Sequence, residues 1–217
     1  MKLYSEKNLS DLIRQNHQTI VHKIKSETED FILNAGEDQY INYLKDQFLL
    51  DAPIMKIENK FVDSCEREIP AQFFPRDLHI THMNRTFPRD VYIYSVPFDG
   101  NINLLSYRPS TYDSSIGYEV NIDQIHNAIK IEVIDFYNKS EKITKAFQTK
   151  LEQVLSCYKY LIIDIEKYNQ NLLVFIKDEL MKRKNKLLKT KQMLSSLGVP
   201  IKEKQEPLQH FLFQILN

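Results

Sequence analysis

The chain has 217 residues, 42% of them hydrophobic, and its 29 basic residues balance 29 acidic ones. This apolar content is sufficient for a packed core and excludes wholesale disorder, while the zero formal charge excludes a whole-chain attraction to nucleic acid or anionic membrane. The length suits one domain, or one compact body with a helical extension.

The cysteine and glycine contents narrow the functional classes further. Cys65 and Cys157 are too few for a secreted disulfide framework, which favours a reducing, cytoplasmic compartment. No apolar stretch approaches the roughly 20 residues that a membrane span requires. The four glycines are isolated from one another, so the sequence contains neither a Walker loop nor a dinucleotide-binding fingerprint, both of which need several glycines close together. We therefore expect no cofactor and no membrane partner.

The N-terminal part, residues 1–52, is expected to be helical. Residues 8–34 carry apolar side chains near one helical face, with Ser10 as an N-cap and Gly36 placed to end the helix in the left-handed conformation. Residues 37–50 repeat the helical pattern, and Pro53 closes the segment.

The middle part, residues 53–137, contains short β-branched and aromatic runs separated by turn residues. Asp99-Gly100-Asn101 indicates a hairpin between two of these runs. Because the connections are short, antiparallel pairing is favoured. We expect a small sheet of four to six strands, or a sandwich of that size, built from residues 54–57, 78–83, 91–96, 102–107, 118–122 and 128–136.

The next part, residues 138–198, is typical of one long helix, followed by a tail at 199–217. Residues 139–197 contain neither proline nor glycine, Asn138 and Glu141 resemble a capping box, and Gly198 follows the last turn. A break near Asn169 is the main alternative. The expected fold class is therefore α+β: a small antiparallel β-sheet body flanked by N-terminal helices and a long C-terminal coiled-coil-like helix.

An apolar stripe runs along this long helix with spacings that alternate between four and three residues, as in a coiled-coil seam. The stripe is longer than the N-terminal helices and a small sheet are expected to cover, which predicts a homo-oligomer or a helical protein partner. The alternative is a helix that breaks into a hairpin and buries its own stripe. The predicted partner-binding residues are Phe147, Leu151, Val154, Tyr158, Leu161, Ile165, Tyr168, Leu172 and Phe175.

A basic run near the end of the helix is the second candidate site. Lys182, Arg183, Lys184 and Lys186 lie in a stretch that contains no acidic residue. Such a run can follow a phosphate backbone, so nucleic acid is a possible partner. The alternative is a solvated helix end, where cations favour the negative pole of the helix macrodipole.

Groups that could carry catalysis or bind a metal are few. His79 and His82 have a metal-like spacing, but in a strand residues i and i+3 point to opposite faces. Asp51, Glu58 and Lys60 form the residue set of a metal-dependent nuclease, yet six residues between the two acids leave no room for a turn between strands. We therefore assign no catalytic and no metal-binding residue, and expect a chain that is not an enzyme.

Three local strings, in this order, resemble a known family. They are EIPAQFFP at residues 68–75, LSYRPST at 105–111 and LGVPI at 197–201, with a long charged helix before the last. Together they resemble the N-terminal region of poorly characterised bacterial proteins that carry a C-terminal restriction-endonuclease-like domain. The resemblance covers about residues 30–201.

In that family the nuclease motifs lie downstream of the last string, so the resemblance carries no catalytic residue over to this chain. It implies either a stand-alone accessory form or a fragment of a longer protein, with a role in defence against phage or foreign DNA by analogy. The expected function is a non-catalytic interaction, assembly or regulatory module, and the alternative is a DNA-binding module that acts through the basic end of the long helix.

Overall fold

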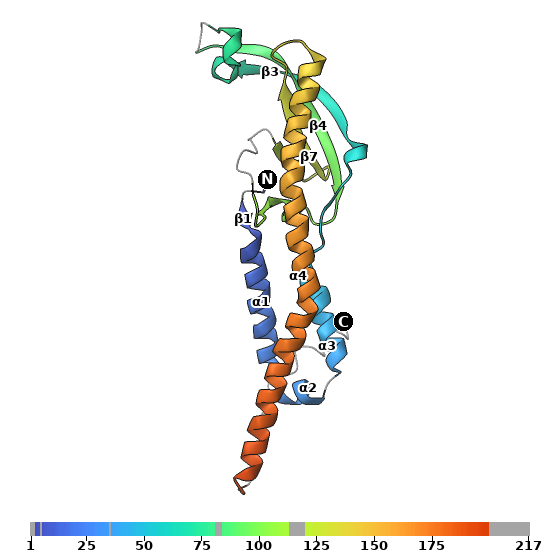
Figure 1. The fold of residues 1–217 in the computed structure, drawn as a ribbon, viewed down its shortest axis with the longest axis vertical. Helices are drawn as coiled ribbons and strands as arrows, with labels where there is room; N and C mark the ends of the chain where they lie inside the picture. The colour runs from blue at the N-terminus through green and yellow to red at the C-terminus, as the bar shows by residue number, and fades with distance from the viewer. Residues whose placement is uncertain (1–2, 5, 35, 81–83, 113–119, 200–217) are drawn as a thin grey trace. The chain divides into compact units, whose positions relative to one another are not determined.

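The computed structural model describes residues 3–4, 6–34, 36–80, 84–112 and 120–199. It confirms the α+β class, with N-terminal helices, an antiparallel sheet and a long C-terminal helix (Figure 1). The chain forms two compact units, each made of two stretches of sequence: unit 1 is Met1–Ser10 with Asp51–Ile165, and unit 2 is Asp11–Leu50 with Glu166–Asn217. The long helix, α4 (Ser140–Ser196), contributes its first part to unit 1 and its second part to unit 2.

Unit 1 contains a five-stranded antiparallel sheet in which the long strand β4 is central. Its described strands are β2 (Ile54–Met55), β3 (Phe61–Pro70), β4 (Thr86–Asp99), β6 (Val120–Asp123) and β7 (Ala128–Ile134). The order is β2-β4-β7-β6, and β3 also pairs with β4, on the side opposite β7. Tyr94 of β4 therefore lies between Val62 of β3 and Ile131 of β7.

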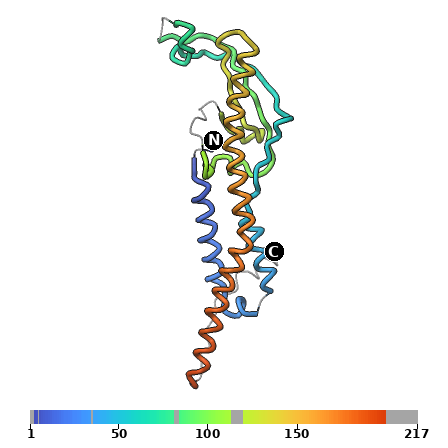
Figure 2. Tube along the Cα trace, viewed as in Figure 1, coloured from blue at the N-terminus to red at the C-terminus, as the bar shows by residue number. Residues whose placement is uncertain are grey.

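One face of this sheet packs on the first part of α4. Alternate residues of β7, namely Ile129, Ile131 and Val133, are buried, as expected for a strand with one covered face. The ring of Tyr94 stacks on Phe147 of α4 with the centroids 3.8 Å apart. The Cα trace in Figure 2 follows this part of α4 along the strands.

The predicted hairpin at Asp99-Gly100-Asn101 is wrong. Gly100 does turn the chain, with φ at 89°, but the next residues form a 3-10 helix, η4 (Ile102–Ser106). The cause is the side chain of Asn101, which accepts a hydrogen bond from the backbone N–H of Asn103 and so starts a helical turn. A two-residue strand follows, β5 (Tyr107–Arg108), which pairs in parallel with β1 (Lys7–Asn8).

The strand predicted at residues 78–83 is also wrong where the structure describes it. A 3-10 helix, η3 (Arg76–Leu78), occupies its start, and His79 takes the left-handed conformation with φ at 44°. Residues 81–83, His82 among them, lie outside the described residues. Short 3-10 helices also occur at η1 (Ile57–Asn59) and η2 (Ala71–Phe73).

The helix predicted over residues 8–34 is two helices, α1 (Leu9–Ser26) and α2 (Glu29–Asn34). The break follows from Thr28, whose buried hydroxyl accepts a hydrogen bond from the backbone N–H of Phe31 at 3.1 Å and caps α2. Ser10 is not an N-cap, because it lies inside α1.

The second predicted helix is confirmed as α3 (Glu37–Phe48). Gly36 precedes it as its N-cap with φ at −62°, so the prediction that Gly36 ends the previous helix in the left-handed conformation is wrong. Glycine is also tolerated at N-caps, which made the two roles hard to distinguish from sequence.

The core of unit 2 is formed by α1, α2 and α3 against the second part of α4. Its buried residues include Ile20, Ile24, Phe31, Tyr40, Ile41, Leu44, Tyr168, Leu172, Ile176, Leu180 and Leu187. Asn16 donates a hydrogen bond to the hydroxyl of Tyr168, and the ring of His17 lies 4.1 Å from that of Phe175. Contacts further along α1 fall further along α4, so the two helices run in the same direction.

The long helix is confirmed and is continuous through Asn169, so the alternative of a break there is wrong. Gly198 follows its end in the left-handed conformation, as predicted, with φ at 67°. The capping box at Asn138 is wrong, because Asn138 has a φ of 52° and its N–H donates to Asp135 before the helix begins. Within the described part of the chain, no helix combines the length and apolar character of a membrane span.

Candidate functional site

The apolar stripe of α4 is buried inside the chain itself. Seven of its nine predicted residues are at most 7% exposed: Phe147, Leu151, Val154, Leu161, Ile165, Tyr168 and Leu172. The other two, Tyr158 and Phe175, are half-buried; the hydroxyl of Tyr158 donates to the carbonyl of Pro53, and Phe175 packs on His17. The prediction that these nine residues form a partner-binding surface is therefore wrong.

The reason is that the sheet and the N-terminal helices cover successive parts of the stripe. In unit 1 the sheet and the segment around Pro53 contact α4, and in unit 2 the core residues of α1 and α3 do so. The predicted length of the stripe was correct. Its cover was underestimated because the sheet's central strand, β4, is 14 residues long, whereas the sequence predicted a run of six.

The basic run lies at the end of α4, beyond most of this cover. Lys182 pairs with Glu179 at 2.6 Å, and Lys184 pairs with Glu37 of α3 at 2.9 Å. Arg183 is half-buried, and Lys186 is exposed. Neither Arg183 nor Lys186 has an acidic partner among the described residues.

Two further lysines, Lys189 and Lys191, extend this surface and are exposed without an acidic partner in the part of the chain described. Between Met181 and Val199 the helix end therefore presents six bases and no acid. Large apolar side chains are exposed between them: Met181, Leu188, Met193 and Leu197 are 45–69% exposed. We call residues 181–199 the basic end of α4.

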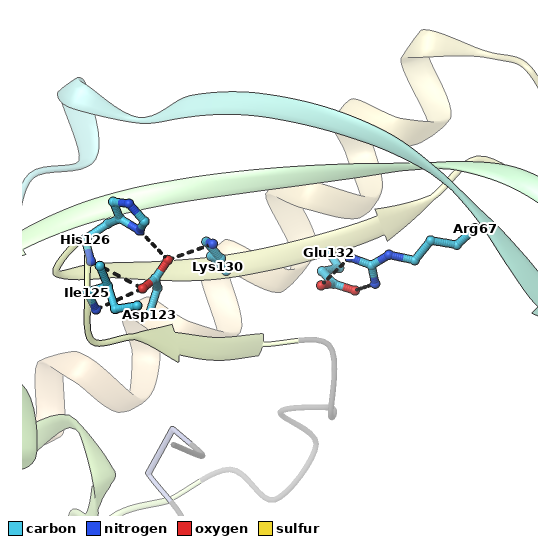
Figure 3. Close-up of polar contacts among 6 residues, drawn as sticks. All are labelled: Arg67, Asp123, Ile125, His126, Lys130 and Glu132. Carbon is cyan, nitrogen blue, oxygen red and sulfur yellow. Dashed lines mark hydrogen bonds and ion pairs between the residues drawn. The ribbon is translucent and has the colours of Figure 1, made fainter.

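In the turn from β6 to β7, Asp123 and His126 are in contact, as the acid and the histidine of a catalytic pair are (Figure 3). Asp123 accepts hydrogen bonds through Oδ1 from the backbone N–H groups of Ile125 and His126, at 3.0 and 3.2 Å. Its Oδ2 lies 2.8 Å from Nδ1 of His126 and 2.7 Å from Nζ of Lys130. Because these four contacts use its acceptor capacity, the carboxylate has a structural role: it holds the turn.

A second polar contact of the sheet joins Arg67 of β3 to Glu132 of β7, with N–O distances of 2.7 and 3.2 Å (Figure 3). This bidentate pair is partly exposed and crosses β4, which separates the two strands. A surface ion pair of this kind contributes little to stability, about 1 kcal/mol at most. It bridges β3 and β7, whose positions are set by backbone pairing with β4, and it offers no reactive group.

Replacing Asp123 by Ala should lower the free energy of unfolding by about 1 kcal/mol at neutral pH. Hydrogen bonds from Lys130 and His126 hold the pKa of Asp123 well below its ordinary value. Its stabilising effect is therefore complete above about pH 4, the ordinary pKa of Asp, and is lost as the pH falls through the lower pKa of the folded state. Urea titrations at pH 7 and pH 2 should show the gap between wild type and variant closing in acid; a constant gap would contradict the assignment.

The other groups considered for chemistry are dispersed. Glu58 lies in η1 rather than on a strand, and both Asp51 and Lys60 are exposed. Cys157 is buried in α4, and Cys65 is partly buried in β3. Among the described residues no cluster of three His, Cys, Asp or Glu side chains could hold a metal ion.

Comparison of the chain with family models, with curated proteins and with solved structures finds no match in any of the three.

Proposed function

We propose that this chain is a non-catalytic binding module that contacts nucleic acid through the basic end of α4. The observation that carries the proposal is the one-sided charge of residues 181–199, where six bases stand without an acid. Only Lys182 and Lys184 are paired with acids among the described residues. The rest of the chain is correspondingly acidic, so any attraction to a polyanion is local to this surface.

The arrangement suits a phosphate backbone better than a protein partner. The four remaining cations are spread along about two turns of one exposed helix, so they can neutralise several successive phosphates. The exposed apolar side chains between them, Leu188 and Met193, can lie against sugars and bases. A coiled-coil partner has less support, because most of the stripe that would form its seam is covered within the chain.

The biological setting of this module is the second part of the proposal. The resemblance of residues 68–75, 105–111 and 197–201 to the N-terminal region of nuclease-bearing bacterial proteins supports an accessory role in a cytoplasmic nuclease or defence system. The reading frame around this chain and its neighbouring genes test that role directly. A nuclease encoded in the same frame or next to it is the expected finding, and a setting without any nuclease or defence gene would contradict it.

Binding to DNA should depend steeply on salt. If about four phosphates are neutralised, the affinity for a short duplex should fall roughly 100-fold between about 50 and about 200 mM salt. Changing the four unpaired cations, Arg183, Lys186, Lys189 and Lys191, together to Ala should weaken binding at least about tenfold at low salt, for every sequence tried, and flatten the salt dependence. Fluorescence anisotropy with a labelled duplex measures both effects.

A control with the same change in charge is available on the same helix. Lys145, Lys159, Lys167 and Lys177 are exposed lysines of α4 outside the basic end. Their combined replacement by Ala should leave DNA binding close to that of the wild type. Equal losses in both variants, or no retention of the wild type on a DNA column at low salt, would overturn the proposal.

A further inference from the structure

A cavity of about 370 Å³ lies between α1 and α4 within unit 2. Its apolar wall is formed by Val21 and Ile24 of α1, and Ile24 belongs to the core of that unit. The volume lies near the lower end of the range of roughly 300–1,000 Å³ that small-molecule sites occupy in proteins. The cavity is therefore large enough for a compact organic ligand.

The remaining lining is strongly cationic. Lys25 comes from α1, and Lys182, Arg183 and Lys186 come from α4. The one carboxylate in the lining, Glu179, is 2.6 Å from Nζ of Lys182 and offsets that charge. Three cations thus face one cavity without a carboxylate of their own in its lining, which favours an anionic occupant.

Arg183 provides a second and independent observation. Its Nε is buried and makes no hydrogen bond to any described residue. A buried donor without an acceptor costs about 1–3 kcal/mol, so the folded chain keeps an unsatisfied N–H at this place. A guanidinium presents its N–H groups as a planar fork that matches two oxygens of a phosphate, and Arg183 lines the cavity, so its N–H groups other than Nε are the ones that can bind an oxyanion there.

We propose that this cavity is a binding site for a phosphate monoester, with Arg183 as the central phosphate ligand and Lys25 and Lys186 as flanking cations. The apolar wall of Val21 and Ile24 would contact the organic part of the ester. This site differs from a contact with a nucleic-acid backbone, because a cavity of this volume, partly open to solvent, takes a single phosphate group. That group can come from a free nucleotide or from the 5′-phosphate end of a strand.

Two of the cations in the lining also have a purely structural role. Lys25 stands in the last turn of α1, where a cation also stabilises the C-terminal carbonyl groups of a helix. Lys182 is engaged by Glu179. Neither role applies to Arg183, which lines the cavity without an acidic partner among the described residues. Arg183→Gln is therefore the decisive variant, and Lys25→Gln, on the other helix, is its independent check.

The test is isothermal titration calorimetry with a nucleoside monophosphate, at about 150 mM salt so that diffuse charge attraction is screened. The wild type should show saturable binding of one ligand per chain, and the matching nucleoside without phosphate should give no heat. Arg183→Gln and Lys25→Gln should each weaken binding by about tenfold or more, as expected for the loss of a charge-assisted hydrogen bond. Lys177→Gln, at an exposed lysine of α4 outside both the cavity and the basic end, should stay within about twofold of the wild type.

Oligonucleotides distinguish the two sources of the phosphate. Displacement of the monophosphate by a 5′-phosphorylated oligonucleotide, but not by its 5′-hydroxyl form, would support the site and identify a strand end as its ligand. Binding of the free monophosphate with no displacement by either oligonucleotide would support a free nucleotide. No saturable binding up to millimolar monophosphate, or equal losses in Arg183→Gln and Lys177→Gln, would overturn the inference.

The outcome is separable from that of the DNA-binding experiment. Retention of duplex DNA by a chain that does not bind the monophosphate would refute the cavity site and leave the proposed function standing. Binding of the monophosphate by a chain that does not bind duplex DNA would support the cavity site and refute the proposed function. Circular dichroism of Arg183→Gln checks its fold, and if that variant is unfolded, Lys25→Gln decides the question alone.

Discussion

Replacing Leu161 or Ile165 by Asp should unfold the part of the chain around it, and should not release a monomer from a dimer. Both side chains are 0% exposed within a single chain. An Asp at either place would bury a carboxylate without a partner and remove a packed side chain, at a cost of about 4 kcal/mol or more. Since small proteins are stable by only about 5–15 kcal/mol, the loss should be visible as a large fall in the urea midpoint.

Ile163 is the matched control, because it is 45% exposed on the same turns of α4. Ile163→Asp should change the free energy of unfolding by less than about 0.5 kcal/mol. Static light scattering on all three variants completes the test. A wild-type dimer that Leu161→Asp converts into a well-folded monomer would contradict the internal position of the stripe.

Replacing Asn169 by Leu should cost about 2 kcal/mol, although the side chain is polar and only half-buried. The Asn169 side chain accepts a hydrogen bond from the N–H of Leu50 at 3.0 Å and donates one to the carbonyl of Leu50 at 2.9 Å. It thereby pairs both polar groups of one backbone residue just after α3. A leucine of similar size would leave that donor and that acceptor without partners.

Asn171 is the control for this change, two residues further along the same helix. Its side-chain N–H donates to the carbonyl of Lys167, one turn earlier in α4, and the residue is exposed. Asn171→Leu should therefore leave the urea midpoint almost unchanged, since leucine is a good helix former. Equal effects of the two substitutions would show that the contact of Asn169 with Leu50 contributes nothing specific.

Features that depend on local chemistry were predictable from the sequence. The long helix followed from residues 139–197, which lack proline and glycine, and its end followed from Gly198. The strands β6 and β7 and the helix α3 were predicted for the same reason. In each case the residues within a few positions of one another carry the information that determines the element.

Features that depend on distant parts of the chain were not predictable in this way. The strand β3 was missed because its first eight residues are mostly polar or exposed on both faces, so that no alternation marks it; backbone pairing with β4 creates it. The start of α2 at Thr28 was predictable from local sequence, since a threonine followed directly by two acidic residues is typical of a helix N-terminus.

The candidate site likewise has a part that was predictable from the sequence and a part that was not. The basic end of α4 could be located from composition alone, because a run of like charges does not need tertiary structure to be recognised. The cavity beside Arg183 could not, since its lining joins Lys25 of α1 to residues more than 150 positions away in α4. The nine-residue stripe was correctly located on the helix and assigned the wrong role, because periodicity shows that a face is covered without showing what covers it.

The strand β3 has a consequence for behaviour at high concentration. It pairs only with β4 among the described strands, so its other side carries ten residues of backbone that could recruit a second chain. Asp63, Glu66 and Glu68 stand along it, and Pro70 closes it. A second copy paired with this edge would bring these acidic side chains close together and remove water from them, which costs free energy. The acids therefore disfavour the edge-to-edge pairing by which an uncharged strand of this length could start a fibril.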